Sequence, residues 1–178
     1  AAYHHRVQIL LFQGACLLLG VRPSVHVLDA LITPHLVLID EKAKPGATAY
    51  SAARLPPVPD QLAGWLGRWE KHRQWITKAA GLTGDLPAFF MIDMQGQQQL
   101  RPACIEDLTP ADWPIVDNGG RHAWRTGTAA SGLPGLLAER ALGHWGLGAE
   151  PGMSGSFCAL SDWSSRWQAA NRYTRKLA

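Results

Sequence analysis

A short segment of the chain places two histidines and an arginine, residue types that can carry positive charge or transfer a proton, close together in sequence. The stretch from Arg121 to Gly146 reads RHAWRTGTAASGLPGLLAERALGHWG and holds His122, Arg125 and His144. A guanidinium stays charged and presents paired donors to phosphoryl oxygens, and a histidine can transfer a proton near neutral pH. A His-x-x-Arg pair by itself is nevertheless frequent on the exposed faces of helices. Its chemistry therefore depends on what the rest of the chain supplies.

Further candidates occur elsewhere along the chain in a fixed order. Arg22 lies in the turn GVRPS, and Lys42 and Lys44 follow in the segment LVLIDEKAK, which precedes ARLPPVP. After the RHAWRT box comes ALGHW, which contains His144, and Tyr173 lies in NRYTR near the end. This ordered set resembles the catalytic domain of the tyrosine recombinases, the phage-integrase family of DNA strand-exchange enzymes. The resemblance covers almost the whole chain.

The resemblance implies a metal-independent cleavage in which cations stabilise the negative charge of the phosphoryl oxygens. Arg22 and Arg125 would grip the two non-bridging oxygens, and His144 would donate a further hydrogen bond to them. His122 would take or steer the proton of the nucleophile. These four side chains would together form a phosphate-binding cleft.

A nucleophile and a proton donor for the leaving group complete the implied site. The nucleophile would be Tyr173, whose hydroxyl would form a covalent 3′-phosphotyrosine, since Tyr3 precedes the first predicted helix and Tyr50 lies on a predicted strand. Lys42 or Lys44, at the tip of a predicted hairpin, would protonate the departing 5′ oxygen once DNA desolvates it. The implied partners are double-stranded DNA and further copies of the chain bound to it. Neither a metal nor a small-molecule cofactor is implied.

The position of the tyrosine leaves alternatives open. Tyr173 lies twenty-nine residues after His144, a longer separation than is usual in the family. A second hypothesis is therefore an integrase-like DNA-binding or accessory module that has lost cleavage activity. A third is a helical domain in which these side chains fill surface and core, with the ring of Tyr173 packed beside Trp167 and Ala170. A metal hydrolase is disfavoured because the histidines lack HExxH spacing.

Composition sets outer limits on these functions. With 178 residues, 47% of them hydrophobic, the chain can bury a core, and we expect residues 1–178 to form a single catalytic-like domain without the family's N-terminal core-binding domain. A formal net charge of +3 permits DNA binding without predicting it. Cys16, Cys104 and Cys158 form no CxxC pair, which argues against a disulfide framework or a cysteine zinc site. We therefore expect a reducing compartment, the bacterial cytoplasm or nucleoid.

No membrane or targeting segment is expected. The apolar run from Gln8 to Val21 is too short to span a bilayer and is interrupted by Gln13 and Gly14. A buried helix is the simpler interpretation, and no signal-peptide cleavage pattern follows the run.

The hydrophobic pattern predicts a mainly helical α+β domain with a small antiparallel β-sheet at one edge, similar to the tyrosine-recombinase catalytic domain. Gly20 should stop the first helix, and Asp60 and Ser161 should cap later ones. Two helices should flank the turn of the 121–146 segment. The other expected helices cover residues 3–19, 25–31, 61–80 and 161–177, and the expected strands cover residues 36–39, 48–55 and part of 87–92.

Three further expectations concern the surroundings of the His-x-x-Arg pair. Residues 116–120, VDNGG, should break the chain directly before it. The TP pair at 109–110 should start a short helix with proline at its first position. Trp124 should face away from the cleft that His122 and Arg125 face.

Overall fold

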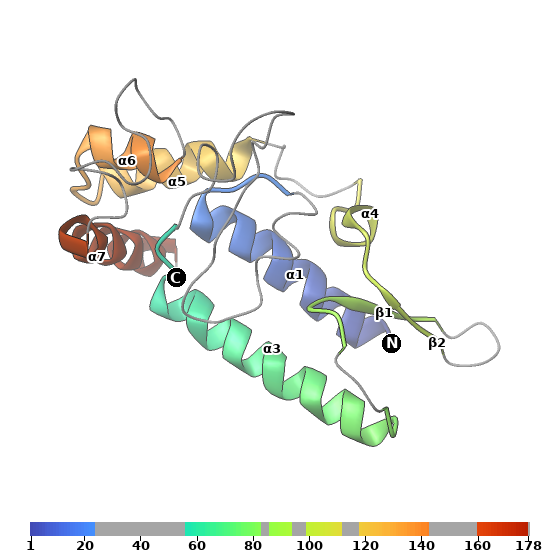
Figure 1. The fold of residues 1–178 in the computed structure, drawn as a ribbon. Coiled ribbons are helices and arrows are strands. Elements are labelled where there is room, and N and C mark those ends of the chain that lie inside the picture. The colour runs from blue at the N-terminus through green and yellow to red at the C-terminus, as the bar shows by residue number, and fades with distance from the viewer. Residues whose placement is uncertain (24–55, 83–85, 94–98, 112–117, 143–159, 178) are drawn as a thin grey trace, which may run out of the picture.

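The computed structural model describes residues 1–23, 56–82, 86–93, 99–111, 118–142 and 160–177 (Figure 1). The elements in chain order are α1 (Ala2–Leu19), α3 (Asp60–Ala79), β1 (Phe90–Asp93), β2 (Gln99–Pro102), α4 (Ile105–Leu108), α5 (Gly119–Ala129), α6 (Gly135–Ala141) and α7 (Leu160–Leu177). Helices dominate, and β1 and β2 form an antiparallel sheet, which confirms the mainly helical α+β class. Outside the described residues lie the predicted helix at 25–31, the strands at 36–39 and 48–55, and Lys42, Lys44 and His144.

Helix α1 is the central element of the fold. It lies between α3 on one side and α4 and α5 on the other, and it contacts all three (Figure 1). Leu11, Phe12 and Ala15 of α1 are buried in the main core, which they share with apolar residues of α3. Gly20 ends the helix as predicted, with a φ of 62° that favours glycine. Among the helices that the structure describes, none has both the length and the apolar character that a membrane crossing needs.

Helix α3 packs on α1 through four buried side chains, Leu62, Leu66, Trp69 and Ile76. The prediction that Asp60 caps this helix is wrong, because Pro59 is the N-cap and contributes no side-chain hydrogen bond. Instead, the backbone N–H of Asp60 donates to Oδ1 of Asn171 on α7, at 2.9 Å. The first N–H groups of a helix have no partner within the helix, so Asn171 supplies from α7 what a capping residue usually supplies locally.

The small sheet is formed by residues other than those of the predicted hairpin. β1 and β2 pair antiparallel, with Phe90 opposite Pro102. The strand expected within 87–92 is confirmed in part, since β1 begins at Phe90, but β2 was not predicted because its sequence QLRP has little apolar character. The sheet borders the start of α1, where Nε2 of His5 accepts a hydrogen bond from the N–H of Ile92 at 3.1 Å.

The short helix α4 lies upstream of its predicted position. The prediction of a helix starting at 109–110 is wrong, because α4 ends at Leu108 and residues 109–111 are not helical. Cys104 is the N-cap of α4, and its backbone N–H donates to the carboxylate of Asp107 at 2.8 Å. After the helix, the hydroxyl of Thr109 donates to the carbonyl oxygen of Ile105 at 2.7 Å. Thr109 thus closes the helix instead of starting one.

Helices α5, α6 and α7 enclose a second core beside α1. The helix, turn and helix predicted for 121–146 are confirmed by α5 and α6. The break predicted at 116–120 is wrong for Gly119 and Gly120, which belong to α5. Gly120 lets α5 approach α1 closely, because a Cβ atom there would lie 3.1 Å from the carbonyl oxygen of Cys16. The buried residues of this second core are Trp124, Leu133, Ala138, Leu142, Ala169 and Tyr173.

Helix α7 is confirmed as an element, but two details differ from the prediction. It begins at Leu160, so Ser161 lies inside the helix and is not its cap. Trp167 is 37% exposed, whereas Ala170 and Tyr173 are buried. The buried face of α7 is therefore rotated away from Trp167.

Candidate phosphate-binding site

Arg22 is positioned by the end of α1 and by the residue that precedes α5. Gly20 turns the chain out of α1, and Nε of Arg22 then donates to Oδ1 of Asn118 at 2.8 Å. Asn118 is the N-cap of α5, and its carbonyl oxygen accepts the hydrogen bond from the N–H of His122. Arg22 is thereby held at the N-terminal end of α5, where the helix dipole adds a partial positive charge.

His122 and Arg125 lie on the same side of α5 as Asn118. The three positions are separated by four and then three residues, which places them one above another on a helix. His122 and Arg125 are exposed, whereas Trp124 is completely buried, so Trp124 faces away from them as predicted. The rise from Asn118 to Arg125 is about 10 Å along the helix axis, and His122 lies between. We call Arg22, His122 and Arg125 the α5 cationic stripe.

A carboxylate from α6 holds one member of this stripe. Nη2 of Arg125 lies 2.5 Å from Oε1 of Glu139, with the two side chains 56% and 29% exposed. Such an exposed ion pair contributes little to stability. The ion pair should instead weaken anion binding at Arg125, because an approaching anion must compete with Glu139. No local sequence pattern predicts this ion pair, since Arg125 lies on α5 and Glu139 on α6.

Arg121, the residue before His122, has a structural role in the packing of α5 and α6. Its side chain is buried, and Nη2 donates to the carbonyl oxygen of Leu142 at 2.5 Å. Leu142 follows α6 and is the last described residue before His144. Arg121 therefore ties the end of α6 to the first turn of α5 and is turned away from the exposed stripe.

The candidate nucleophile Tyr173 is not part of the α5 cationic stripe. Its ring packs on Gly127 of α5, where a Cβ atom would come within 2.2 Å of ring carbons Cδ2 and Cε2. At about 100° per residue, Gly127 lies on the side of α5 opposite to His122 and Arg125. The structure therefore brings Arg22, His122 and Arg125 to one side of α5 and Tyr173 to the other.

The environment of the Tyr173 phenol is that of a core residue. The side chain is 4% exposed, and its hydroxyl finds no hydrogen-bond partner among the residues that the structure describes. Burial raises the pKa of Tyr173 above its ordinary value, because a phenolate is poorly solvated in an apolar core. A phenol in this environment is a weaker nucleophile than one at the surface, since ionisation is what makes it reactive.

No metal centre is evident in this part of the molecule. Within the described ranges, no group of three or more His, Cys, Asp and Glu side chains could hold a metal ion. Comparisons of the chain with protein-family models, with curated proteins and with solved structures find no match. A functional assignment therefore has to be argued from the motifs and from the geometry around α5.

Proposed function

We propose that this chain is the catalytic domain of a tyrosine-recombinase-like enzyme, which binds double-stranded DNA and cleaves and rejoins it through a covalent 3′-phosphotyrosine. The observation that carries the proposal is the hydrogen bond from Arg22 to Asn118. It joins the GVRPS turn to the N-cap of α5, the helix that carries the RHAWRT box, so two motifs far apart in sequence meet at one end of one helix. Such a convergence is what a shared phosphate site requires.

The α5 cationic stripe has the chemistry that a DNA phosphate needs. Arg22 and Arg125 are permanently charged and carry several N–H donors each, which suits them to the non-bridging oxygens. His122, exposed between them, is suited to exchange a proton with the attacking hydroxyl. In this proposal His144 donates to the same oxygens, and Lys42 or Lys44 protonates the 5′ oxygen that leaves.

Cleavage by this scheme needs a change in the position of the nucleophile. The oxygen of Tyr173 would attack phosphorus, the bond from phosphorus to the 5′ oxygen would break, and rejoining would reverse both events. Tyr173 must first leave Gly127, or the tyrosine must come from another copy of the chain assembled on the same DNA. Either route exposes a phenol whose pKa burial now raises.

A DNA-binding or accessory module without cleavage activity is the second candidate. The position of Tyr173 favours it, because the ring fills the core between α5 and α7 on the side away from Arg125. In that case, the α5 cationic stripe would bind the DNA backbone without reacting with it. Both candidates place the protein with DNA, in the bacterial cytoplasm or nucleoid.

A trapping experiment separates the two candidates. The protein is incubated with nicked duplexes from which the short fragment on the 3′ side of the scissile phosphate, which carries the freed 5′ hydroxyl, is lost after cleavage. Covalent complexes are resolved on denaturing gels. An adduct that Tyr173→Phe abolishes and Tyr3→Phe leaves intact supports the recombinase; Tyr3 is 76% exposed and serves as the matched control. Duplex binding that weakens with salt and with Arg125→Ala, but yields no adduct, supports the accessory module. Absence of both adduct and duplex binding contradicts both proposals.

A further inference from the structure

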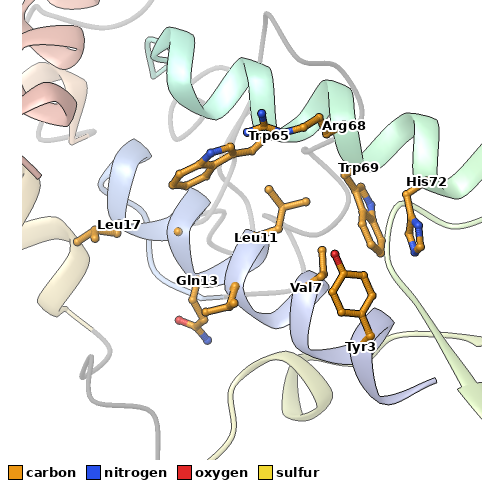
Figure 2. Close-up of a pocket in the computed structure, with 11 residues that line it drawn as sticks. Tyr3, Val7, Leu11, Gln13, Leu17, Trp65, Arg68, Trp69 and His72 are labelled. Carbon is orange, nitrogen blue, oxygen red and sulfur yellow. The ribbon is translucent and has the colours of Figure 1, made fainter. Parts of the chain in front are cut away.

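An apolar groove runs between α1 and α3, away from the α5 cationic stripe. Its volume is about 640 Å³, and Tyr3, Val7 and Leu17 of α1 and Trp65 of α3 lie along it (Figure 2). Two of its large apolar residues are strongly exposed, Tyr3 by 76% and Leu10 by 60%. Neither the phosphate chemistry nor the packing of the main core explains this exposure.

The α1 wall of the groove has a regular spacing. Tyr3, Val7, Leu10, Gly14 and Leu17 all line it, and they are separated by four, three, four and three residues. Alternation of three and four is the spacing of the a and d positions in a heptad repeat, which forms the seam between packed helices. The wall therefore presents a continuous stripe suited to another helix over most of the length of α1.

The α3 wall continues the same pattern. Trp65, Arg68 and His72 line the groove at steps of three and four, and Trp75, three residues further, is 66% exposed. Toward the Leu17 end of the groove, the indole of Trp65 packs against α1, because a Cβ atom at Gly14 would be 3.1 Å from its Cζ3 (Figure 2).

The two walls are antiparallel and joined at their ends. At the end opposite to Trp65, Nδ1 of His4 lies 3.1 Å from Nε2 of His72. The lining extends from Tyr3 to Leu17 on α1 and from Trp65 to His72 on α3, and this length suits an elongated occupant better than a compact small molecule.

The charges beside the groove are of one sign. Arg68 lines it, Arg6 is exposed on α1 next to Val7, and α1 contains no acidic residue. The acidic side chain nearest in sequence to Arg68, Glu70, is engaged by Arg73 at 2.5 Å. A second copy of this chain would bring the same basic residues against them, so like charges oppose self-association through this groove.

We propose that the groove between α1 and α3 docks an amphipathic helix of another protein, whose apolar stripe with three-and-four spacing is flanked by Asp and Glu. The apolar stripe would pack on Leu10, Gly14 and Trp65, and the acidic flanks would face Arg6 and Arg68. The site does not depend on DNA binding, because none of these residues belongs to the α5 cationic stripe.

A pair of synthetic peptides tests this proposal with the full chain. Both are helical and about 21 residues long, or three heptads, with Leu at positions a and d; one carries Glu at e and g and the other Lys. Binding of the labelled peptides is followed by fluorescence anisotropy. We expect the Glu peptide to bind at least about tenfold more tightly than the Lys peptide, and Arg68→Glu to reverse this preference.

Variants at exposed positions locate the binding without disturbing the core. Leu10→Glu should abolish binding of the Glu peptide, whereas Leu177→Glu on α7, also an exposed leucine, should leave it unchanged. Duplex DNA binding should be the same in both variants. A failure of the groove to bind the peptide can therefore be distinguished from a failure of the proposed DNA function. Equal binding of both peptides, insensitivity to Leu10→Glu, or absence of binding overturns the proposal. So does a dimer in sedimentation that Leu10→Glu dissociates, because the occupant is then a second copy.

Discussion

The ring of Tyr173 lies directly against the backbone of Gly127, and this contact joins α7 to α5. A Cβ atom at position 127 would lie 2.2 Å from two ring carbons, closer than side chains approach one another, and 3.1 Å from Cγ. The glycine therefore has a packing role that does not depend on catalysis. The same contact keeps the phenol on the side of α5 opposite to Arg125.

Gly127→Ala should destabilise the protein by about 1–3 kcal/mol, because the ring must move out of a packed core. In an unobstructed helix the same change usually stabilises, by roughly 0.5–1 kcal/mol. Gly64→Ala on α3 is the matched control, since no atom lies within 4 Å of a Cβ there. Urea unfolding measures both variants. If Gly127→Ala proved as stable as Gly64→Ala, the packing of Tyr173 on α5 would be wrong.

Tyr173→Phe should leave stability at neutral pH unchanged or raise it by up to about 1 kcal/mol, because the buried hydroxyl finds no partner among the described residues. The effect of alkaline pH should be larger. Burial raises the pKa of Tyr173 above its ordinary 10.0, so the unfolded chain loses this proton first. The stability that the neutral phenol contributes is complete below pH 10 and is lost as pH rises through the folded pKa.

The measurement for Tyr173 is the free energy of unfolding at pH 8, 10 and 11. The wild type should lose more stability across this range than Tyr173→Phe does. Tyr3→Phe, at an exposed tyrosine, should follow the wild type. Parallel pH profiles for all three proteins would show that Tyr173 ionises as freely in the folded state as in the unfolded one.

His4 should make the fold sensitive to acid. Its Nε2 donates to the carbonyl oxygen of Phe90 at 2.9 Å, so Nδ1 is the nitrogen that accepts from Nε2 of His72 at 3.1 Å. Burial lowers the pKa of His4 below its ordinary 6.5, and the nearby His72 and His5 act in the same direction. The unfolded chain therefore takes up protons first as pH falls, and stability decreases.

We expect the free energy of unfolding to be greatest above pH 6.5 and to fall as pH is lowered through the folded pKa of His4. His5 adds to this trend, because its Nε2 accepts from the N–H of Ile92 and burial lowers its pKa too. His4→Leu should be less stable at pH 7.5 but should lose less stability between pH 7.5 and pH 5. His122→Leu, at an exposed histidine, should keep the wild-type profile. If the free energy of unfolding of the wild type did not change between pH 7.5 and pH 5, the buried, neutral His4 would be contradicted.

The helices could be predicted because their signals are local. Apolar residues at helical spacing marked α1, α3 and α7, and Gly20 marked the end of α1 through a backbone conformation that glycine adopts most easily. The exposed side of α5 could also be predicted from local spacing. At helical spacing, His122 and Arg125 lie on one side of the helix and the indole of Trp124 on another. These features need no knowledge of distant partners.

The remaining features depend on partners that are far apart in sequence. The strand β2 is stabilised by pairing with β1 and not by the character of QLRP. Gly119 and Gly120 look like a chain break, yet α5 begins at Gly119. At Gly120 the close approach of α1 at Cys16 leaves little room for a side chain. Likewise, the motif NRYTR predicted a nucleophile at Tyr173. In the structure Asn171 caps α3 and the ring of Tyr173 is buried in the second core.

Asn171→Ala should destabilise α3 although the residue lies on α7. Loss of the Oδ1 acceptor leaves the N–H of Asp60 without its partner at 2.9 Å, and loss of a helix cap costs about 1 kcal/mol. Amide hydrogen exchange near Asp60 should accelerate, and the urea midpoint should fall. Arg175→Ala, at an exposed position of the same helix, should change neither. Unchanged exchange near Asp60 would show that Asn171 is not its acceptor in solution.

Glu139→Gln should strengthen binding to duplex DNA if Arg125 contacts a phosphate. The carboxylate of Glu139 lies 2.5 Å from the Arg125 guanidinium and competes with DNA for it. Removing the charge frees Arg125, so we expect affinity to rise and the salt dependence to steepen by up to about one phosphate contact. Arg125→Ala should change both quantities in the opposite direction. Fluorescence anisotropy at several salt concentrations measures each variant.

Two controls separate release of Arg125 from a general change in charge. Glu70→Gln on α3 removes an acidic group that is also 2.5 Å from an arginine, Arg73, and it should leave DNA binding unchanged. In the Arg125→Ala background, Glu139→Gln should give no further gain, because the residue that it would release is absent. An equal gain with and without Arg125, or from Glu70→Gln, would mean that net charge governs binding and that the α5 cationic stripe holds no phosphate.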